Sequence, residues 1–290
     1  MRFWCSVSFL DPPDMLGVAR AADDYGFDGV MIADHLVFPE KLTSPYPYSD
    51  NGAPFWEAQR PWLDPWVAIG AMAAVTSRVR FSNNIYIAPA RHPLVIAKAV
   101  SSAAVLSGGR VALGAGVGWM REEFDAADQD FSTRGRRLDE MIEILRALWT
   151  GEMVEYHGTY YDFDRLSISP VAERPIPVYC GGDSDAALRR AARVDGWVGS
   201  LYDPEYAVER VAALNAVRAE QGTTDRHDYE VFIALDGPAD DLDLYRRLED
   251  AGVTSIMCTP WWKVANAGGS HAELRSSIER FAERVVHPLT

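Results

Sequence analysis

The sequence predicts an α/β protein built as a parallel (β/α)8 barrel, a TIM barrel, with insertion loops at its C-terminal face. Short apolar runs alternate with helix-period segments from one end of the chain to the other, and eight such units can be counted. The 290 residues are about the usual length for this architecture. No shift in composition marks a linker, so we expect residues 1–290 to form one domain.

Each unit pairs an apolar run with a helical segment. The expected strands are residues 2–9, 28–33, 78–88, 110–118, 176–182, 196–201, 229–235 and 253–260. The helices that alternate with them are residues 14–27, 64–76, 93–109, 133–151, 184–194, 203–222, 241–252 and 271–286. Between the fourth helix and the fifth strand, we expect a structural hairpin that turns around His157 and Gly158.

The helices are justified by apolar spacing and by their first residues. Residues 133–151 have the clearest helical face, formed by Leu138, Met141, Ile142, Leu145 and Trp149. Two helices begin with an Asp-Pro pair, which supplies a capping side chain and a proline in the first turn: Asp64–Pro65 and Asp203–Pro204.

Composition limits the classes of partner. The formal net charge is −14 without a long run of one sign, which argues against nucleic acid or an anionic membrane, although a local basic pocket for a small anion is compatible with it. Cys5, Cys180 and Cys258 are far apart and show no metal-ligand spacing. The N-terminus has no signal-peptide pattern, so a cytoplasmic location is expected.

Asp34 and His35 stand where the second apolar run stops. In a (β/α)8 barrel the C-terminal ends of the strands carry the chemistry, so both residues are expected on the working face. Two interpretations stay open: a functional pair, or a capping Asp beside a partly buried, hydrogen-bonded His.

Other strand ends are also unusual. The adjacent Asn83 and Asn84 in the third strand indicate a bulge, or an ordinary strand with one Asn pointing inward. After the fourth strand, glycines such as Gly116 allow close approach of something flat or simply form a turn, while Glu122 and Glu123 can cap the next helix. Gly181 and Gly182 precede a helix N-terminus, a natural phosphate seat, although many turns contain such a pair.

The loop at residues 36–63 is too long for a simple connector. It contains five aromatic residues, which predict either a lid or substrate wall or a loop that packs its own side chains on the barrel: Tyr46, Tyr48, Phe55, Trp56 and Trp62.

These segments together resemble a known family. GFDGVMIADHL, SRVRFSNNIYIAPARHPLVIAK, LSGGRVALGAGVGWMREEF, RGRRLDEMIEILRALWTGE and IPVYCGGDSDAALRRAARVDGW are similar, in this order, to the bacterial luciferase-like flavin oxidoreductase superfamily. More narrowly, they resemble its branch that depends on the deazaflavin coenzyme F-420. The resemblance runs from Met1 to about Trp197, and beyond Ser200 only the strand–helix alternation supports it.

The resemblance implies roles for individual residues. His35 would lie near the reactive carbon of the deazaflavin and transfer a proton or polarise the reacting oxygen, and Asp34 would orient His35 or stabilise its charged form. Asn83, Asn84 and Ile85, in a bulge with a non-prolyl cis peptide at Asn84–Ile85, would support the ring. The segment from Gly116 to Glu122 would meet the ring edge.

The remaining implied positions concern the cofactor tail, the substrate and assembly. Gly181, Gly182 and Asp183, with Ser200, would hold the phosphate, and relatives are often homodimers. Trp119 stands where sugar-phosphate dehydrogenases of this branch have an acidic residue, so the resemblance does not extend to their substrate. With Trp56 and Trp62, Trp119 suggests a small apolar or aromatic substrate.

The leading hypothesis is therefore an oxidoreductase that exchanges a hydride between coenzyme F-420 and an organic substrate. The first alternative shares the family: a monooxygenase that uses FMN and oxygen. A metal-dependent barrel hydrolase using Asp34, His35 and His92 is a rival from another class, although His92 is expected to begin a helix. A non-enzymatic cofactor-binding protein is a further alternative.

Overall fold

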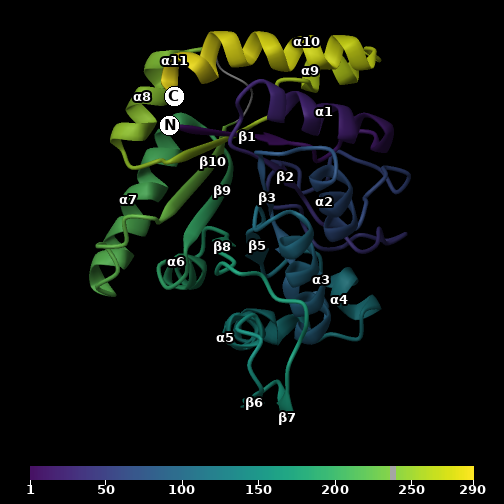
Figure 1. Cartoon of the computed structure of the whole chain (residues 1–290), viewed down its shortest axis with the longest axis vertical. Helices are drawn as coiled ribbons and strands as arrows, with labels where there is room; N and C mark the ends of the chain where they lie inside the picture. The colour runs from purple at the N-terminus through teal and green to yellow at the C-terminus, as the bar shows by residue number, and fades with distance from the viewer. Residues whose placement is uncertain (236–239) are drawn as a thin grey trace.

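The chain forms a barrel of parallel strands surrounded by helices (Figure 1). The computed structural model describes residues 1–235 and 240–290, with the backbone alone at Ser200. The strand order is β3-β2-β1-β11-β10-β9-β8-β5-β4, and all neighbours in it run parallel. The predicted (β/α)8 barrel is confirmed.

The barrel strands fall within the predicted apolar runs, except that β9 continues one residue further, to Tyr202. They are β1 (Arg2–Ser6), β2 (Gly29–Ile32), β3 (Arg80–Asn83), β4 (Tyr86–Ile87), β5 (Leu113–Gly116), β8 (Val178–Gly181), β9 (Gly196–Tyr202), β10 (Glu230–Leu235) and β11 (Ser255–Cys258).

The third strand is divided into two pieces. β3 pairs with β2, β4 pairs with β5, and the peptide between Asn84 and Ile85 separates them and is cis. The expected irregular backbone and the expected cis bond are both confirmed. A single bridge between Phe81 and Val111 joins β3 to the approach of β5 and closes the ring.

In the described part of the chain, eight helices of at least seven residues follow the strands, and shorter helices lie between them. The long helices are α1 (Pro12–Asp24), α2 (Pro65–Ala73), α3 (Pro93–Leu106), α5 (Arg134–Leu148), α6 (Asp185–Ala191), α7 (Pro204–Glu220), α8 (Leu242–Asp250) and α10 (His271–Phe281). The shorter ones are η1 (Ala88–Ala90), α4 (Arg121–Ala126), η2 (Phe131–Thr133), α9 (Trp262–Asn266), η3 (Ala282–Val286) and α11 (His287–Leu289).

Local chemistry starts the helices as predicted. The Asp64 carboxylate accepts hydrogen bonds from the first-turn amides of α2, and Asp203 does the same for α7. His92 begins α3, where its ring accepts from the Leu94 amide at 3.3 Å. His92 is therefore a capping residue, as expected.

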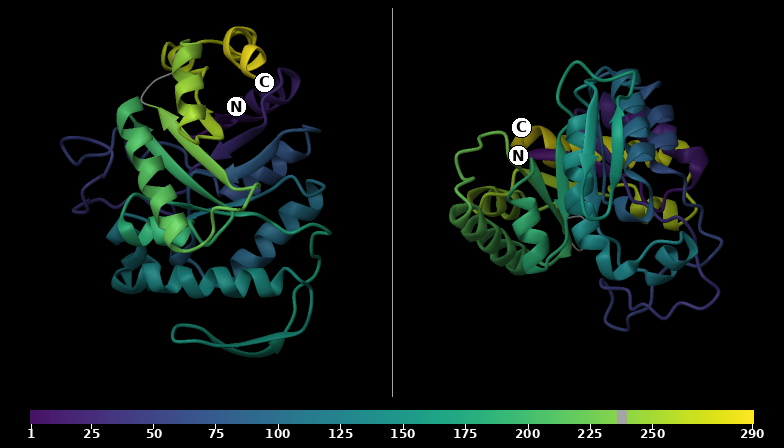
Figure 2. Two further views of the ribbon diagram at one scale, coloured as in Figure 1. Left: turned by 90° about the vertical axis from the view of Figure 1, so that its left-hand side faces the viewer. Right: turned by 90° about the horizontal axis from the view of Figure 1, so that it is seen from below.

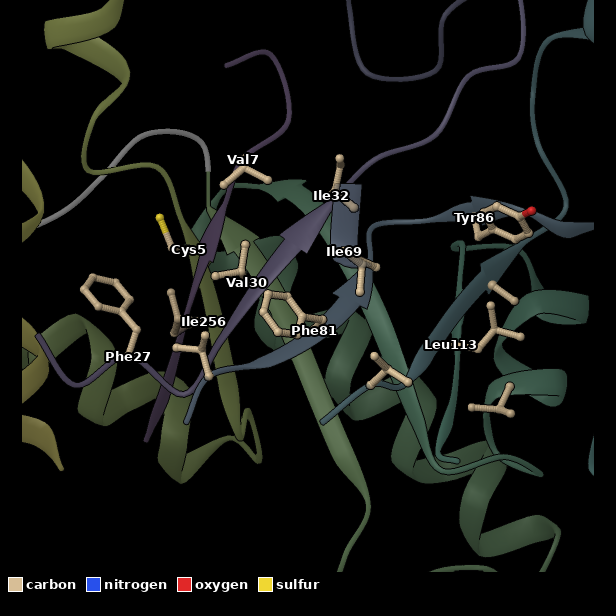
Figure 3. Close-up of a cluster of buried hydrophobic side chains, with 14 of the residues drawn as sticks. Cys5, Val7, Phe27, Val30, Ile32, Ile69, Phe81, Tyr86, Leu113 and Ile256 are labelled. Carbon is tan, nitrogen blue, oxygen red and sulfur yellow. The ribbon is translucent and has the colours of Figure 1, made fainter. Parts of the chain in front are cut away.

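The main core lies between the strands and the helices. In Figure 3, the side chains of Val30 and Ile32 of β2 and of Phe81 of β3 lie together with Ile69 of α2 in one buried cluster. Burial of this apolar layer is the principal source of stability for the fold. A second cluster fills the inside of the barrel with one side chain from most strands: Trp4, Met31, Ala112, Tyr179, Val198, Phe232 and Met257.

A polar network closes the N-terminal end of the barrel. The buried Glu230 carboxylate accepts hydrogen bonds from Arg80 at 2.7 Å, Tyr179 at 2.9 Å and Ser255 at 3.3 Å, and Arg2 lies 3.7 Å away. Arg2, Arg80, Glu230 and Ser255 are the first residues of their strands. This end is the barrel floor.

The hairpin predicted between the fourth helix and the fifth strand is present. β6 (Val154–His157) and β7 (Asp162–Leu166) pair antiparallel, and they stand away from the barrel beside α5 (Figure 2). Glu140 of α5 accepts from the amides of Thr159 and Tyr160, which fixes the turn. Within the described residues, none of the helices has the length and apolar character needed to span a bilayer.

Candidate active site

Asp34 lies at the C-terminal end of β2 and is held by an arginine. Its carboxylate receives two hydrogen bonds from the Arg91 guanidinium, at 2.7 and 2.9 Å, and one from the Ile87 amide at 2.9 Å. Burial raises the pKa of the Asp34 carboxyl, and the Arg91 contacts oppose that effect. Asp34 thereby fastens the end of β2 to the backbone of β4 and to the segment that precedes α3.

His35 takes a different partner. Its Nδ1 lies 3.1 Å from Glu123 Oε2, and the other Glu123 oxygen accepts from the Leu36 amide at 2.7 Å. The Glu123 side chain is completely buried, and 9% of the His35 side chain is exposed. The expected orientation of His35 by Asp34 is not matched by a hydrogen bond between the two described side chains, because both Asp34 oxygens are held by Arg91. Successive side chains at a strand end point in different directions, so Asp34 reaches Arg91 while His35 reaches α4.

Three tryptophan rings surround the His35 imidazole. Ring centroids lie 4.8 Å from Trp62, 5.4 Å from Trp56 and 5.9 Å from Trp119. Two of these tryptophans come from the long loop and the third from the segment after β5. The predicted substrate-contacting tryptophans thus lie together around the predicted catalytic histidine. The indole N–H groups of Trp56 and Trp62 are buried and have no acceptor within the described part of the chain.

The long loop packs its aromatic residues on the mouth of the barrel. Tyr46 contacts Trp56 at 5.0 Å and Trp119 at 5.3 Å, and Phe9 contacts Phe55 at 4.7 Å and Trp56 at 5.4 Å. The packing of these aromatic side chains on the barrel is observed, and the same side chains enclose His35. A role of the loop as a lid or substrate wall is compatible with this packing and stays a prediction.

Glu122 secures this loop. One oxygen accepts from the Thr43 amide at 2.7 Å, the Thr43 hydroxyl at 2.6 Å and the Ser44 amide at 3.1 Å. Partial burial would raise the pKa of Glu122, but these hydrogen bonds outweigh it and lower the pKa to about 2. Sequence reasoning placed Glu122 against a cofactor ring, whereas the structure places its carboxylate against the loop backbone.

Ile85, which follows the cis peptide, packs between two glycines. A Cβ atom at Gly116 would lie 1.6 Å from Ile85 Cδ1, and one at Gly181 would lie 2.8 Å from Ile85 Cγ2. Both positions must therefore be glycine for the Ile85 side chain to occupy this place. Ile85 is half-buried and packs on the cluster inside the barrel, and Asn84 beside it is half-buried as well.

Asn83 lies deeper than its neighbours. It has no exposed surface, and its amide oxygen and nitrogen find no partner among the described residues. It is thus a buried polar group without compensation on the protein side.

The expected phosphate seat contains a carboxylate. Gly182 has φ of +112°, its carbonyl accepts from Trp197 Nε1 at 3.0 Å, and the Asp183 carboxylate accepts from the Tyr202 phenol. Arg210 of α7 contacts this segment: its guanidinium donates to the Asp183 carbonyl at 3.0 Å, and its buried Nε has no partner among the described residues. Ser200 lies in β9, and its side chain is outside the described part of the structure.

Comparisons with known proteins identify the family. The sequence profile of the luciferase-like monooxygenases matches residues 7–238, which is most of the chain. The chain belongs to the luciferase-like monooxygenase family. The resemblance seen in the sequence is confirmed, and the match extends beyond the segments that carried it.

The relatives of the chain include an uncharacterized protein and an F-420-dependent dehydrogenase. The chain is 36% identical over 289 residues to an uncharacterized protein of Mycobacterium tuberculosis, covering 99% of each chain. It is 35% identical over 191 residues to the F-420-dependent glucose-6-phosphate dehydrogenase of Nakamurella multipartita, covering 64% of this chain and 52% of the dehydrogenase.

Solved structures share the fold at low identity. The monooxygenase RslO1 from Streptomyces bottropensis superposes with a TM-score of 0.77 at 18% identity and covers 100% of both chains. The coenzyme F-420-dependent tetrahydromethanopterin reductase from Methanopyrus kandleri superposes with a TM-score of 0.75 at 16% identity, covering 100% of this chain and 99% of the reductase.

Sequence reasoning missed three residues of the candidate site. Arg91 follows the third strand in the segment ARHPL, next to the strand that precedes Asp34. An arginine after one strand and a carboxylate after its neighbour were the available signal. Glu123 was noted only as a possible helix cap beside Glu122. Arg210 lies inside the amphipathic pattern of α7, which gives no indication of its contact with Asp183. Each has its role through a partner far away in sequence.

Proposed function

We propose that this luciferase-like protein is an oxidoreductase that exchanges a hydride between coenzyme F-420 and a small apolar or aromatic substrate. The observation that carries the proposal is the His35–Glu123 pair, enclosed by tryptophans at the mouth of the barrel. A histidine held by a carboxylate in a largely apolar enclosure is suited to moving one proton beside a hydride acceptor.

The relatives support a deazaflavin as the cofactor. The dehydrogenase of Nakamurella multipartita is F-420-dependent and is 35% identical over the matched 191 residues. The reductase of Methanopyrus kandleri is also F-420-dependent, and it supports the proposal through the fold alone.

The residues at the mouth fit a flat cofactor ring. Ile85 offers a half-buried apolar surface beside Asn84. The absence of side chains at Gly116 and Gly181 leaves room for the Ile85 side chain to form this surface. Arg210 would balance charge on the cofactor tail, since its Nε is buried without a partner beside the Gly182–Asp183 segment. The bound deazaflavin supplies a ring carbon that gives or accepts a hydride.

The protein's own residues would bind and orient the substrate, and they would exclude water. The Nε2 atom of His35 would accept a proton from the reacting oxygen or nitrogen of the substrate, or return one to it. Trp56, Trp62 and Trp119 would exclude water and contact an apolar or aromatic substrate. The buried N–H groups of Trp56 and Trp62 favour a substrate that also carries a hydrogen-bond acceptor, because orphaned buried donors are costly.

Titration of the purified protein tests the cofactor. Oxidised coenzyme F-420 should quench the tryptophan fluorescence with a micromolar Kd or tighter, whereas FMN should bind at least about tenfold more weakly, a difference of about 1.4 kcal/mol. A screen of secondary alcohols and aromatic ketones should then change the deazaflavin absorbance. His35→Ala should reduce the rate by about 100-fold or more with little change in cofactor Kd.

An FMN monooxygenase is the second candidate. The family description and the monooxygenase RslO1 favour it. Tight binding of FMN without binding of the deazaflavin, with oxygen consumption when reduced FMN and substrate are supplied, would establish this alternative and reject ours.

A further inference from the structure

The contact between His35 and Glu123 determines where the imidazole proton lies. An ionised carboxylate can only accept hydrogen bonds. Glu123 Oε1 already accepts from the Leu36 amide at 2.7 Å, and Oε2 faces His35 Nδ1 at 3.1 Å. A neutral imidazole paired in this way must carry its proton on Nδ1, which leaves Nε2 as an acceptor.

We propose that Glu123 is a positioning residue that fixes His35 in the Nδ1-protonated tautomer and orients its ring, so that Nε2 is the atom that accepts a proton from the substrate. This inference rests on the proposed function for its catalytic meaning. The tautomer itself depends only on the apo-protein.

Other charged groups near His35 are already engaged. Asp34, the preceding residue, has both oxygens on Arg91. Glu122, the residue before Glu123, is bound through its Oε1 to Thr43 and Ser44, and no hydrogen bond joins its Oε2 to His35. The aromatic rings that contact His35 in the described structure belong to tryptophans, which do not titrate. Glu123 is therefore the carboxylate that can set the tautomer.

The Leu36 amide makes the pairing directional. If Glu123 is replaced by Gln, the Leu36 N–H still requires an acceptor, so the Gln carbonyl oxygen must face it. The Gln amide nitrogen then faces His35 Nδ1 as a donor. Nδ1 must become the acceptor and the proton moves to Nε2. Glu123→Gln is nearly isosteric and should invert the tautomer without emptying the space.

Nitrogen NMR of the ring tests this in the apo-protein. Protein labelled with ¹⁵N at histidine is measured at a pH where imidazoles are neutral, and His35→Asn identifies the His35 signals. We expect a protonated, pyrrole-like Nδ1 and an unprotonated, pyridine-like Nε2 in the native protein, and the reverse in Glu123→Gln. Glu122→Gln is the matched control, because it alters the neighbouring carboxylate but leaves the His35 tautomer unchanged.

Two results would overturn the inference: a native His35 protonated on Nε2, or a Glu123→Gln spectrum identical to the native one. Once a substrate is found, Glu123→Gln should lower kcat by about 100-fold while KM and cofactor Kd change less than about threefold. If deazaflavin does not bind but the tautomer behaves as expected, the proposed function fails and the positioning role of Glu123 remains. If deazaflavin binds and is reduced but the tautomer does not respond, only this inference fails.

Discussion

Two adjacent residues of the site, Asp34 and His35, belong to separate hydrogen-bond systems. Asp34 is a buried carboxylate matched by Arg91, and its role is to fix the ends of two strands. His35 is matched by Glu123 and lies among aromatic rings. Because the partners differ, substitutions at the two positions should have different consequences. Changes around Asp34 should affect stability, and changes around His35 should affect turnover.

Arg91→Ala should destabilise the protein by about 3–5 kcal/mol, because it leaves the Asp34 carboxylate buried without a cation. Arg91→Lys should cost less, since a lysine keeps the charge but provides one point contact instead of two parallel hydrogen bonds. Urea denaturation followed by tryptophan fluorescence measures both.

The control for Arg91 is Arg60→Ala. Arg60 reaches Asp11 at 3.4 Å, and 65% of the Asp11 side chain is exposed, so the change should lie within about 0.5 kcal/mol. If Arg91→Ala is as mild as this control, the structural role of the Asp34–Arg91 pair is refuted.

At the scale of elements, the strand–helix units follow from the sequence pattern, and the links between them do not. The long amphipathic helix α5 and the Asp-Pro helix starts are local signals, so they were predicted correctly. The short helices α4 and α9 have six and five residues and are too short to show a helical period. Contacts such as Glu123 with His35 join residues 88 positions apart, and no local pattern carries them.

Asp23 illustrates a link between elements that pH can test. At the end of α1, its carboxylate accepts from the amides of Ser77, Arg78 and Val79, each at 2.8 Å, and so holds the entry to β3. Burial would raise the pKa of Asp23, but these hydrogen bonds outweigh it and lower the pKa below its ordinary value of 3.8. A lowered pKa means that the folded state prefers the ionised form.

Asp23→Ala should therefore destabilise the protein by about 1–3 kcal/mol at neutral pH, because it leaves buried amides without acceptors. The native stabilisation is complete above the unfolded pKa and is lost as pH falls through the lower folded value. Urea titrations should give a constant difference between native protein and variant from pH 7 to 5, and a smaller one below about pH 4. A difference that grows on acidification would contradict this account.

At the scale of the whole molecule, the two ends of the barrel have different tasks. The mouth gathers His35, Glu123 and the tryptophans, whereas the floor contains the Glu230 network that joins the first residues of several strands. Burial and then the Glu230 charge raise the pKa of Tyr179, so its phenol stays a hydrogen-bond donor. The second cluster, which includes Trp4 and fills the inside of the barrel, lies between the two ends.

This separation predicts that a floor substitution changes stability without changing the site. Glu230→Ala should destabilise the protein by about 3 kcal/mol, because Arg80 loses its carboxylate and the buried Tyr179 hydroxyl loses its acceptor. The Kd for the deazaflavin, measured below the unfolding transition, should stay within about twofold of the native value.

The matched control for the floor is Glu249→Ala. Glu249 pairs with the N-terminal ammonium at 2.6 Å, but 49% of its side chain is exposed, so its loss should cost less than about 1 kcal/mol. A Glu230→Ala variant with native stability and weakened cofactor binding would show that the floor and the mouth are coupled. Since the Glu230 network and the His35–Glu123 network share no residue, we expect the two ends to respond independently.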